Sequence, residues 1–530
     1  MRVLILALLF TSPTTPHDFR ADAIRAHMQF LASDMLEGRG TGTRGYRIAA
    51  EYVAAQYALS GLEPGANGSW YQEVPFRKTT PGDDGSITIA RSGATPVRFR
   101  IFDTFISQGD PLHADRTVDG EVVFAGFGVS APDQRYDDYR GVDVRGKIVA
   151  IFSGAPQRFP NAVRAHHSST ATKIETVAQQ GAKGLIFLTS PRDAQRMPWA
   201  RNVRQSRLGS MYWLRADGTP HAVYPEVSHS VTLSLDATRT FLGTEADEIF
   251  AAIERGDPHP HTLPVRATIR LTSRHETVNS PNVVGIIRGS DPKLRDEYIV
   301  YSSHLDHLGI TVAVDGDAIN NGALDNASGV ATILEIARNI AALPHKPKRS
   351  ILFLATTGEE KGLRGADYFA NNPTVPQDAL AGVINLDMIM LTHRTRDVLA
   401  LGAETNDLGD LARDAASAMR VELSPDPFPD EVFFVRSDQY PFVRRGIPAI
   451  YLDSGYKAVD PKINMQHEME EWMRMRYHSP KDDLDQKLDY SAALPVAELA
   501  YRLGVSAAER TQRPRWKTGD FFGETFGKKR

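Results

Sequence analysis

Three short apolar runs, each leading into an acidic or histidine residue, limit the fold of this chain more than any other feature of its sequence. Runs of this length, separated by helical patterns, are typical of strands buried on both faces of a parallel sheet. The sequence therefore predicts an α/β fold with a mixed, mostly parallel sheet flanked by helices. The runs are residues 298–303, 351–357 and 383–386, and they lead into His304, into Glu359 with Glu360, and into Asp387.

The carboxyl ends of parallel strands lie along one edge of a sheet, where ligands of α/β proteins bind. We therefore expect the residues that follow the three runs to lie close together. Buried like charges are costly unless a cation neutralises them, so the cluster indicates a metal site. Because the chain has no cysteine, disulfides, thiolate nucleophiles and cysteine zinc sites are excluded, and the ligands must be histidine and carboxylate.

Two further candidate ligands lie outside these runs. Asp325 lies in a polar, glycine-containing segment, residues 320–330, in which an amphipathic helix begins, and His478 lies far along the chain. Taken alone, Asp325 is also consistent with an ordinary residue at the start of a helix, where the helix dipole favours a carboxylate. The candidates are then two histidines and three carboxylates, with one member of the Glu359–Glu360 pair spare. Such a set suits zinc and, with one bridging carboxylate, two ions about 3.5–4 Å apart.

The residues beside the candidate ligands indicate the accompanying chemistry. A pair of metal ions lowers the pKa of a bound water to about 7 and polarises a carbonyl group. The spare carboxylate would take the proton of that water and pass it to a leaving amine. Asp306 lies two residues after His304 on one side of an extended segment, so it can accept the second ring N–H of His304 and fix the tautomer. His307 follows and is a weaker candidate ligand.

Other motifs of the chain do not support a different chemistry. The net charge of −4 gives no sign of nucleic-acid binding. Gly40, Gly42 and Gly45 fit the G-x-G-x-x-G pattern, but a helical pattern precedes them, so a glycine-rich loop near a cleft is favoured over a dinucleotide site. His467 and Glu468 begin like the zinc motif H-E-x-x-H but lack its second histidine, and no G-x-S-x-G motif is present.

The length of 530 residues indicates two or three domains. A positive charge followed by apolar residues 3–10 and a polar break resembles a secretory signal, which predicts export to the periplasm or the medium, and no other stretch is long enough for a membrane helix. The middle of the chain is expected to form a smaller β-rich unit, a lid or interaction module, with His166–His167 in a solvated loop. The predicted parts are a signal peptide (1–16), the N-terminal part of the main domain (17–115), the inserted unit (116–240), the catalytic domain (241–510) and a solvated or loosely docked tail (511–530).

Five segments of the chain, in this order, resemble the M28 family of co-catalytic zinc aminopeptidases. The resemblance extends over roughly residues 279–508 and a helical start at 21–64, and it implies a zinc-exopeptidase-like fold. The inserted unit resembles a protease-associated (PA) domain, notably in residues 141–149 and 181–186. The five segments are Ser303–Gly309, Gly322–Gly329, Thr357–Gly365, Asn385–Met388 and Tyr477–Pro480.

The resemblance implies two Zn²⁺ ions per chain and a place for each ligand. Asp325 would bridge the two ions. His304 and Asp387 would complete one ion site, and Glu360 and His478 would complete the other. Every residue of this set is present in the sequence.

The resemblance also implies roles for residues that do not bind zinc. Glu359 would be the general base, Asp306 would orient His304, and Tyr477 would hydrogen-bond the developing oxyanion. Asn326 stands where many members have a second aspartate. Since this position is not a ligand in the family, metal binding is expected to survive, and the unusual cis peptide of the family is expected here as well.

These roles together predict a di-zinc metallo-exopeptidase that hydrolyses N-terminal residues from peptides, with no nucleic acid or membrane span involved. Three alternatives stay open. A carboxypeptidase of acidic dipeptides would need a basic pocket, for which Arg436, Arg444 and Arg445 are candidates. A receptor-like relative would have lost its metal ligands, which this chain retains. A glutaminyl-cyclase-like transferase would typically lack the inserted unit.

Overall fold

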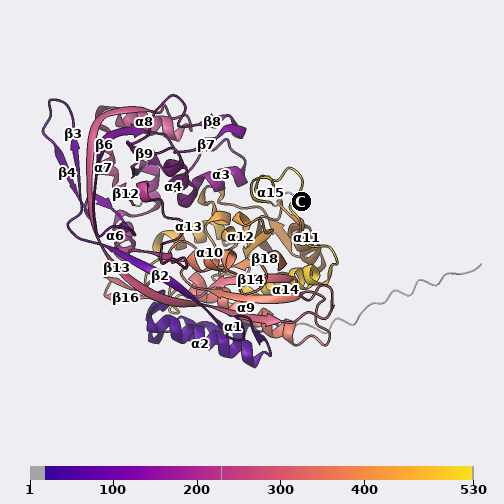
Figure 1. The fold of residues 1–530 in the computed structure, drawn as a ribbon. Helices are drawn as coiled ribbons and strands as arrows, with labels where there is room; N and C mark the ends of the chain where they lie inside the picture. Colours follow the sequence, from indigo (N-terminus) through magenta and orange to yellow (C-terminus); the bar gives the residue numbers. More distant parts are fainter. Residues whose placement is uncertain (1–17, 228, 528–530) are drawn as a thin grey trace, which may run out of the picture.

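The computed structural model describes residues 18–227 and 229–527 of the chain. The predicted signal peptide, residues 1–16, lies outside them. Figure 1 shows a larger sheet covered by helices and a smaller unit above it, and one long strand, β13 (His261–Ile287), runs through both. Among the described residues, no helix has the length and apolar character that crossing a bilayer requires.

The larger sheet is mixed and mostly parallel at its centre, which confirms the predicted fold class. β17, β14, β18 and β21 lie side by side in parallel, while β13 and β19 flank them antiparallel. Every residue of β14, β17 and β18 is buried, which explains why their sequences are uninterrupted apolar runs. The bounds are β14 (Tyr298–His304), β17 (Ser350–Thr356), β18 (Leu380–Leu386), β19 (Asp397–Leu401) and β21 (Ala449–Ser454).

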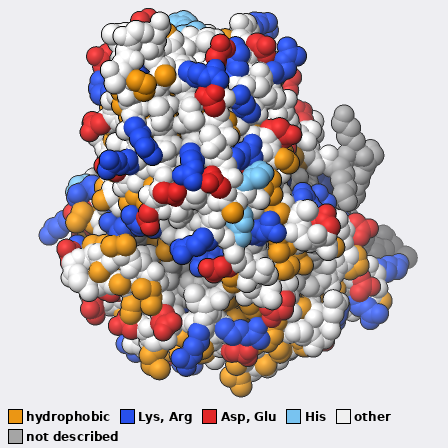
Figure 2. All heavy atoms as spheres, turned by 60° about the vertical axis from the view of Figure 1, so that its left-hand side comes forward, with side chains coloured by type: hydrophobic (Ala, Val, Ile, Leu, Met, Phe, Trp, Pro, Cys, Tyr) orange, Lys and Arg blue, Asp and Glu red, His pale blue; other side chains and the backbone are white. Residues whose placement is uncertain are grey.

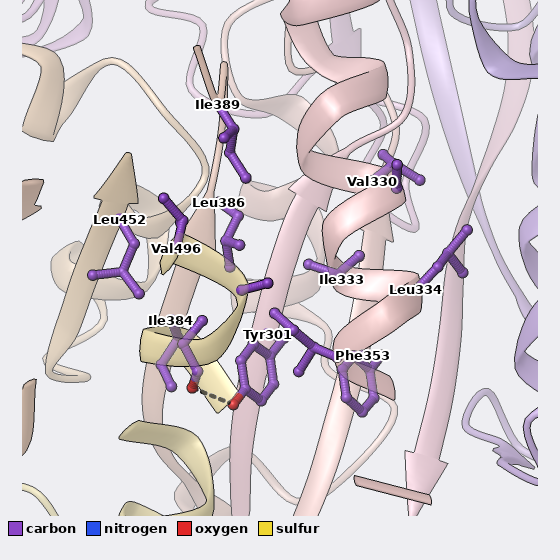
Figure 3. Packing of buried hydrophobic residues seen from close by; sticks show 14 of the residues in the cluster. Tyr301, Val330, Ile333, Leu334, Phe353, Ile384, Leu386, Ile389, Leu452 and Val496 are labelled. Carbon is purple, nitrogen blue, oxygen red and sulfur yellow. Dashed lines mark hydrogen bonds between the residues drawn. The ribbon is translucent and has the colours of Figure 1, made fainter. Parts of the chain in front are cut away.

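Alternate residues of these strands pack against opposite layers of helices. Tyr301 belongs to one core and its neighbour Val300 to the other. Figure 3 shows the first core, in which the Tyr301 hydroxyl also donates a hydrogen bond to the carbonyl of Ala500 at 2.7 Å. Each buried side chain of this size contributes about 1.5–3 kcal/mol, so the core fixes the strands firmly. The first layer is α1 (Ala21–Leu31), α2 (Arg44–Leu59), α9 (Ser328–Ala341), α11 (Asp407–Met419) and α14 (Leu494–Glu509); the second is α10 (Arg364–Asn371), α12 (Gln439–Arg444) and α15 (Phe521–Phe526).

The smaller unit, residues 86–254, has its own sheet and cores, and we call it the second unit. β6, β9, β10 and β12 lie parallel in this order, and the first half of β13 pairs with β6 and β3. This sheet includes segments outside residues 116–240. The bounds predicted for the inserted unit therefore stay a prediction. The strands are β3 (Ser86–Ala90), β6 (Asp115–Phe124), β9 (Ile148–Phe152), β10 (Gly184–Leu188) and β12 (Ser230–Leu233), and the helices include α3 (Asn161–Ser168), α4 (Thr170–Gln179), α5 (Pro191–Arg196), α6 (Trp199–Arg207), α7 (Leu235–Leu242) and α8 (Ala246–Glu254).

One expectation about the periphery is wrong. His166 and His167 lie on helix α3 rather than in a solvated loop and are half-buried, and Nδ1 of His166 is 2.7 Å from the hydroxyl of Tyr440. This error comes from aromatic packing between distant segments, which local polarity does not reveal. Of the two states expected for the tail, its described residues show the docked one, because Phe522 is buried and the indole of Trp516 donates a hydrogen bond to a main-chain carbonyl at 3.0 Å.

Candidate metal centre

The structure brings the strand-end residues to one edge of the larger sheet. His304 is the last residue of β14, and Asp387 directly follows β18. Glu359 and Glu360 lie in the turn between β17 and α10. Because these strands are parallel and adjacent, their carboxyl ends meet at one place.

Asp325 lies between two histidines, and a different carboxylate oxygen is nearest each of them. Its Oδ1 is 3.2 Å from Nε2 of His304, and its Oδ2 is 3.3 Å from Nε2 of His478. His304 Nε2 also lies 3.0 Å from Oδ1 of Asp387. His478 Nε2 lies 3.1 Å from Oε2 of Glu360. The five predicted ligands therefore form two groups of three that share one aspartate.

His307 lies closer to the site than its sequence position indicated. Its ring is fully buried, and Nδ1 is 2.6 Å from Oε1 of Glu360 and 3.9 Å from Oδ2 of Asp325. Yet within the described part of the chain, neither ring nitrogen nor that glutamate oxygen has a hydrogen-bond partner. An orphaned buried carboxylate oxygen such as Oε1 of Glu360 fits a cation bound at this side of the cluster. The donor set of imidazoles and carboxylates fits zinc.

The electrostatics of the cluster require positive charge. Burial lowers the pKa of His304, but the carboxylate of Asp387 and its neighbours outweigh burial and raise it well above its usual value. Burial also opposes the charge of His478, yet Glu360 and Asp325 raise its pKa to about 9. Burial raises the pKa of those two carboxyls, but the histidines lower both below the usual range. Divalent ions would supply this charge with neutral imidazoles as ligands.

Glu359 lies at the pocket of the cluster, and its carboxyl is not among the five candidate ligands. Burial raises its pKa well above the usual value; His304 opposes this, while Asp387 and Glu360 add to it. Its side chain lines the same small pocket as His304 and His478. A carboxyl whose pKa is raised above its usual range, in a site for reacting groups, is suited to carry a proton.

Asp306 does not act as the sequence predicted. Nδ1 of His304 lies 3.0 Å from the main-chain carbonyl oxygen of Asp306, not from its carboxylate. The carboxylate faces the other way and accepts hydrogen bonds from the Thr41 hydroxyl at 2.8 Å and from the Glu359 N–H at 3.0 Å. The chain turns after β14, so the alternation of an extended strand no longer gives the side-chain direction. Asp306 therefore holds the turn that carries Glu359.

Ser437 orients Asp387, the carboxylate beside His304. Its hydroxyl donates a hydrogen bond to Oδ2 of Asp387 at 2.6 Å and accepts one from the amide of Asn385 at 2.8 Å. The hydroxyl of Ser302 in turn donates to that asparagine at 2.6 Å. All these side chains are buried. Such a network fixes the orientation of the aspartate before any metal binds.

Asn326 is satisfied by four hydrogen bonds and does not join the candidate ligands. Its amide nitrogen donates to the Ser303 hydroxyl at 3.0 Å and to the Leu386 carbonyl at 3.2 Å. Its oxygen accepts from the N–H groups of Gly329 at 2.9 Å and Met388 at 3.1 Å. An aspartate could not donate these two bonds when ionised. The peptide bond between Asp325 and Asn326 is cis, as expected.

The glycine-rich loop near the N-terminus packs against the site, as expected, but its contribution was not foreseen. The buried guanidinium of Arg39 donates hydrogen bonds to the carbonyls of Leu305 at 2.9 Å and Asn321 at 2.6 Å. A Cβ at Gly38 would lie 2.3 Å from the carbonyl oxygen of Asn320, so only glycine fits there. This loop thereby joins the loop after β14 to the loop before α9.

Tyr477 and Arg436 line the mouth of the site. The ring of Tyr477 stacks on His478 with centroids 3.7 Å apart, and its hydroxyl accepts a hydrogen bond from Arg436 at 3.3 Å. The guanidinium of Arg436 also pairs with Glu431 at 3.0 Å. Of the three arginines considered from the sequence, Arg436 is the one that lines the site.

A cavity of about 590 Å³ lies between the second unit and the catalytic edge. It shares Phe433, Arg436 and Tyr477 with the small pocket at the metal centre, so the two adjoin. Several arginines line it, and acidic residues pair with most of them, whereas Arg201 donates hydrogen bonds to main-chain carbonyls. Asp430 lies 2.7 Å from Arg164 and 2.5 Å from Arg192 across the two units. The cavity is large enough for several residues of a peptide.

Comparison with known families agrees with this geometry. Residues 282–503 match the model of peptidase family M28. The chain contains an M28 peptidase domain. This M28 domain carries all five predicted ligands and Glu359, whereas Arg39, Thr41 and the second unit lie outside the matched residues.

The M28 domain has relatives among curated proteins and solved structures. The chain is 42% identical over 113 residues to a probable zinc metalloprotease of Pyrenophora teres f. teres, covering 21% of this chain and 23% of that relative. It is 24% identical to the probable lipoprotein aminopeptidase LpqL of Mycobacterium tuberculosis, covering 92% of this chain and 85% of the relative. An aminopeptidase from Aneurinibacillus sp. strain AM-1 shares the fold, with a TM-score of 0.53 and 21% identity over 93% of this chain and 95% of that one.

Proposed function

We propose that the chain is a zinc-dependent metallopeptidase that removes N-terminal residues from peptides. In this proposal His304 and Asp387 hold one ion, Glu360 and His478 hold the other, and Asp325 bridges them. The observation that carries the proposal is the position of Asp325, with one oxygen 3.2 Å from one histidine and the other 3.3 Å from the second. Two ions about 3.5–4 Å apart use this kind of shared carboxylate.

Glu359 would act as the general base. Bound zinc would supply a Lewis acid for the scissile carbonyl and lower the pKa of water. Glu359 would accept a proton from the attacking water on its carboxylate and give it to the leaving nitrogen. The hydroxyl of Tyr477 and the guanidinium of Arg436, which line the same pocket, would donate hydrogen bonds to the charge that develops on the carbonyl oxygen.

Removal of N-terminal residues is favoured over hydrolysis of acidic dipeptides. A pocket for acidic side chains needs free positive charge, but Arg436 is paired with Glu431 and Arg444 with Glu175 at 2.9 Å. Arg445 is exposed and does not line the cavity or the small pocket. A receptor without metal is disfavoured because the donor set is complete.

The cellular setting is a further part of the proposal. We place the protein outside the cytoplasm, with residues 1–16 as a signal peptide and residues 116–240 as a PA-like insert that covers the cavity. A relative over most of the chain is named a probable lipoprotein aminopeptidase, which supports export. On the face in Figure 2, acidic and basic side chains are interspersed, which fits a peptide rather than a nucleic acid as partner. Cell fractionation and N-terminal sequencing of the mature protein test the export.

A hydrolysis panel tests the activity. Aminoacyl p-nitroanilides with a free amine, the same compounds with a blocked amine, and dipeptides with a C-terminal glutamate are compared on one zinc-analysed sample. We expect hydrolysis of the free-amine compounds alone, its loss after treatment with a chelator, and its return with zinc. Cleavage of the blocked compounds or of the acidic dipeptides alone would contradict the proposed specificity, and activity that survives complete metal removal would contradict the mechanism.

A further inference from the structure

Helix α6 of the second unit reaches one of the candidate metal ligands. The amide nitrogen of Gln205 lies 2.6 Å from Nδ1 of His478. The other ring nitrogen, Nε2, faces Asp325 and Glu360. The contact joins a helix outside the M28 domain to a residue near the end of that domain.

Helix α6 is held firmly where Gln205 makes this contact. The buried side chain of Arg201, one turn earlier, donates hydrogen bonds to the carbonyls of Met473, at 3.0 Å, and Arg474. These carbonyls belong to the last turn of helix α13 (Met465–Met475), which leads into His478. On its other side, Ser206 donates a hydrogen bond to the Ser107 carbonyl of the second unit at 2.6 Å. The helix is thus fixed to both units.

A histidine that binds a metal through Nε2 carries its proton on Nδ1 and needs an acceptor there. An amide side chain offers an oxygen or a nitrogen at nearly the same place, because half a turn about its last bond exchanges them. We propose that Gln205 is a positioning residue for His478, and that its Oε1 accepts the Nδ1–H when the imidazole binds zinc. The second unit would thereby complete one half of the metal centre. This inference rests on the proposed zinc site.

The test compares three variants with the wild type. Gln205→Leu removes the acceptor at nearly constant size, and Gln205→Glu keeps an acceptor at the same reach. Gln195→Leu is the matched control, because Gln195 lies on α5 of the same unit and lines the cavity without contacting the histidine. Zinc stoichiometry and affinity are measured by competition with a chromophoric chelator, and the cobalt-substituted proteins are compared by absorption spectroscopy. Thermal unfolding checks that each variant is folded.

We expect Gln205→Leu to weaken the binding of one of the two ions by about 10- to 100-fold, with a change in the cobalt spectrum of that ion alone. Gln205→Glu and Gln195→Leu should bind both ions like the wild type. Wild-type affinity for both ions in Gln205→Leu, or equal losses in Gln205→Leu and Gln205→Glu, would overturn the inference. A wild-type protein that binds no zinc would instead overturn the proposed function.

Discussion

The two halves of the candidate metal centre are supported by different parts of the molecule. In the His304–Asp387 half, His304 ends one strand of the buried sheet and Asp387 directly follows another. Their partners are the main-chain carbonyl of Asp306 and the hydroxyl of Ser437. In the other half, His478 lies in a loop after α13, its side chain is 15% exposed, and its partner is Gln205 of the second unit. The direct partners of one half therefore lie within the M28 domain, whereas the other half has a direct partner on a helix outside it.

The two halves of one metal centre can therefore differ in how firmly the fold positions their ligands before metal binds. Partners on adjacent buried strands are fixed by the same core that stabilises the fold. A partner on another unit is correctly positioned only while the two units keep their contact. We therefore expect the ion beside His478 to be the more weakly bound of the two and the more sensitive to changes in the second unit.

The largest effect is expected at the residue that both halves share. Asp325→Ala should remove both ions and lower kcat/KM by more than about four orders of magnitude, since the whole metal mechanism is lost. Elemental analysis of the purified protein and a hydrolysis assay measure this. If one full equivalent of zinc remained, the aspartate would not bridge the halves.

Glu359→Gln should separate chemistry from metal binding. The amide keeps the shape of the side chain but cannot take a proton, so we expect two bound zinc ions and a kcat lower by about 10²- to 10⁴-fold. Steady-state kinetics and zinc analysis on one sample check this. Unchanged turnover would remove Glu359 as the base.

Ser437→Ala should weaken metal binding in the His304–Asp387 half of the centre, which Gln205 does not contact. Loss of its hydrogen bond to Asp387 is expected to lower the affinity for the ion beside His304 by about 10- to 100-fold and to leave the other ion unchanged. Chelator competition with cobalt spectra distinguishes the ions. In the double variant with Gln205→Leu, the losses of affinity for the two ions should add, because Ser437 and Gln205 contact different ligands. If either single variant weakened the binding of both ions equally, the division into halves would be refuted.

The smallest effect is expected at the contact between the units. Asp430→Asn weakens the pairs with Arg164 and Arg192. Asp430 itself is 43% exposed, and ion pairs at exposed positions are worth about 0.2–1 kcal/mol. We predict a drop of up to about fivefold in affinity for the ion beside His478 and none for the other. An equal drop for both ions would show that the contact supports the whole centre rather than one half.

The sequence was sufficient to predict that these candidate ligands lie close together, because three of them follow buried strands. His304, Glu360 and Asp387 follow apolar runs, and parallel pairing then brings them together without further information. The direction of the Asp306 carboxylate could not be predicted, since it depends on the turn after β14. Its hydrogen-bond partner Thr41 lies far away in the sequence.

Contacts between units were also beyond prediction. Gln205 lies on an ordinary polar helix, and no local pattern marks it as the neighbour of His478. Likewise, no local pattern predicted that Arg39, in a glycine-rich loop, would donate hydrogen bonds to the loops that carry the candidate ligands. The burial of His307 beside Glu360 was also not predicted, because sequence position gives no burial, whereas the folded chain buries its ring completely.

The most direct test of the central claim is an X-ray anomalous difference map recorded at the zinc edge from crystals grown with zinc. We predict two peaks about 3.5–4 Å apart, with Asp325 between them, His304 and Asp387 at one, and Glu360 and His478 at the other. A single peak, or a second peak bound by His307 in place of His478, would contradict it.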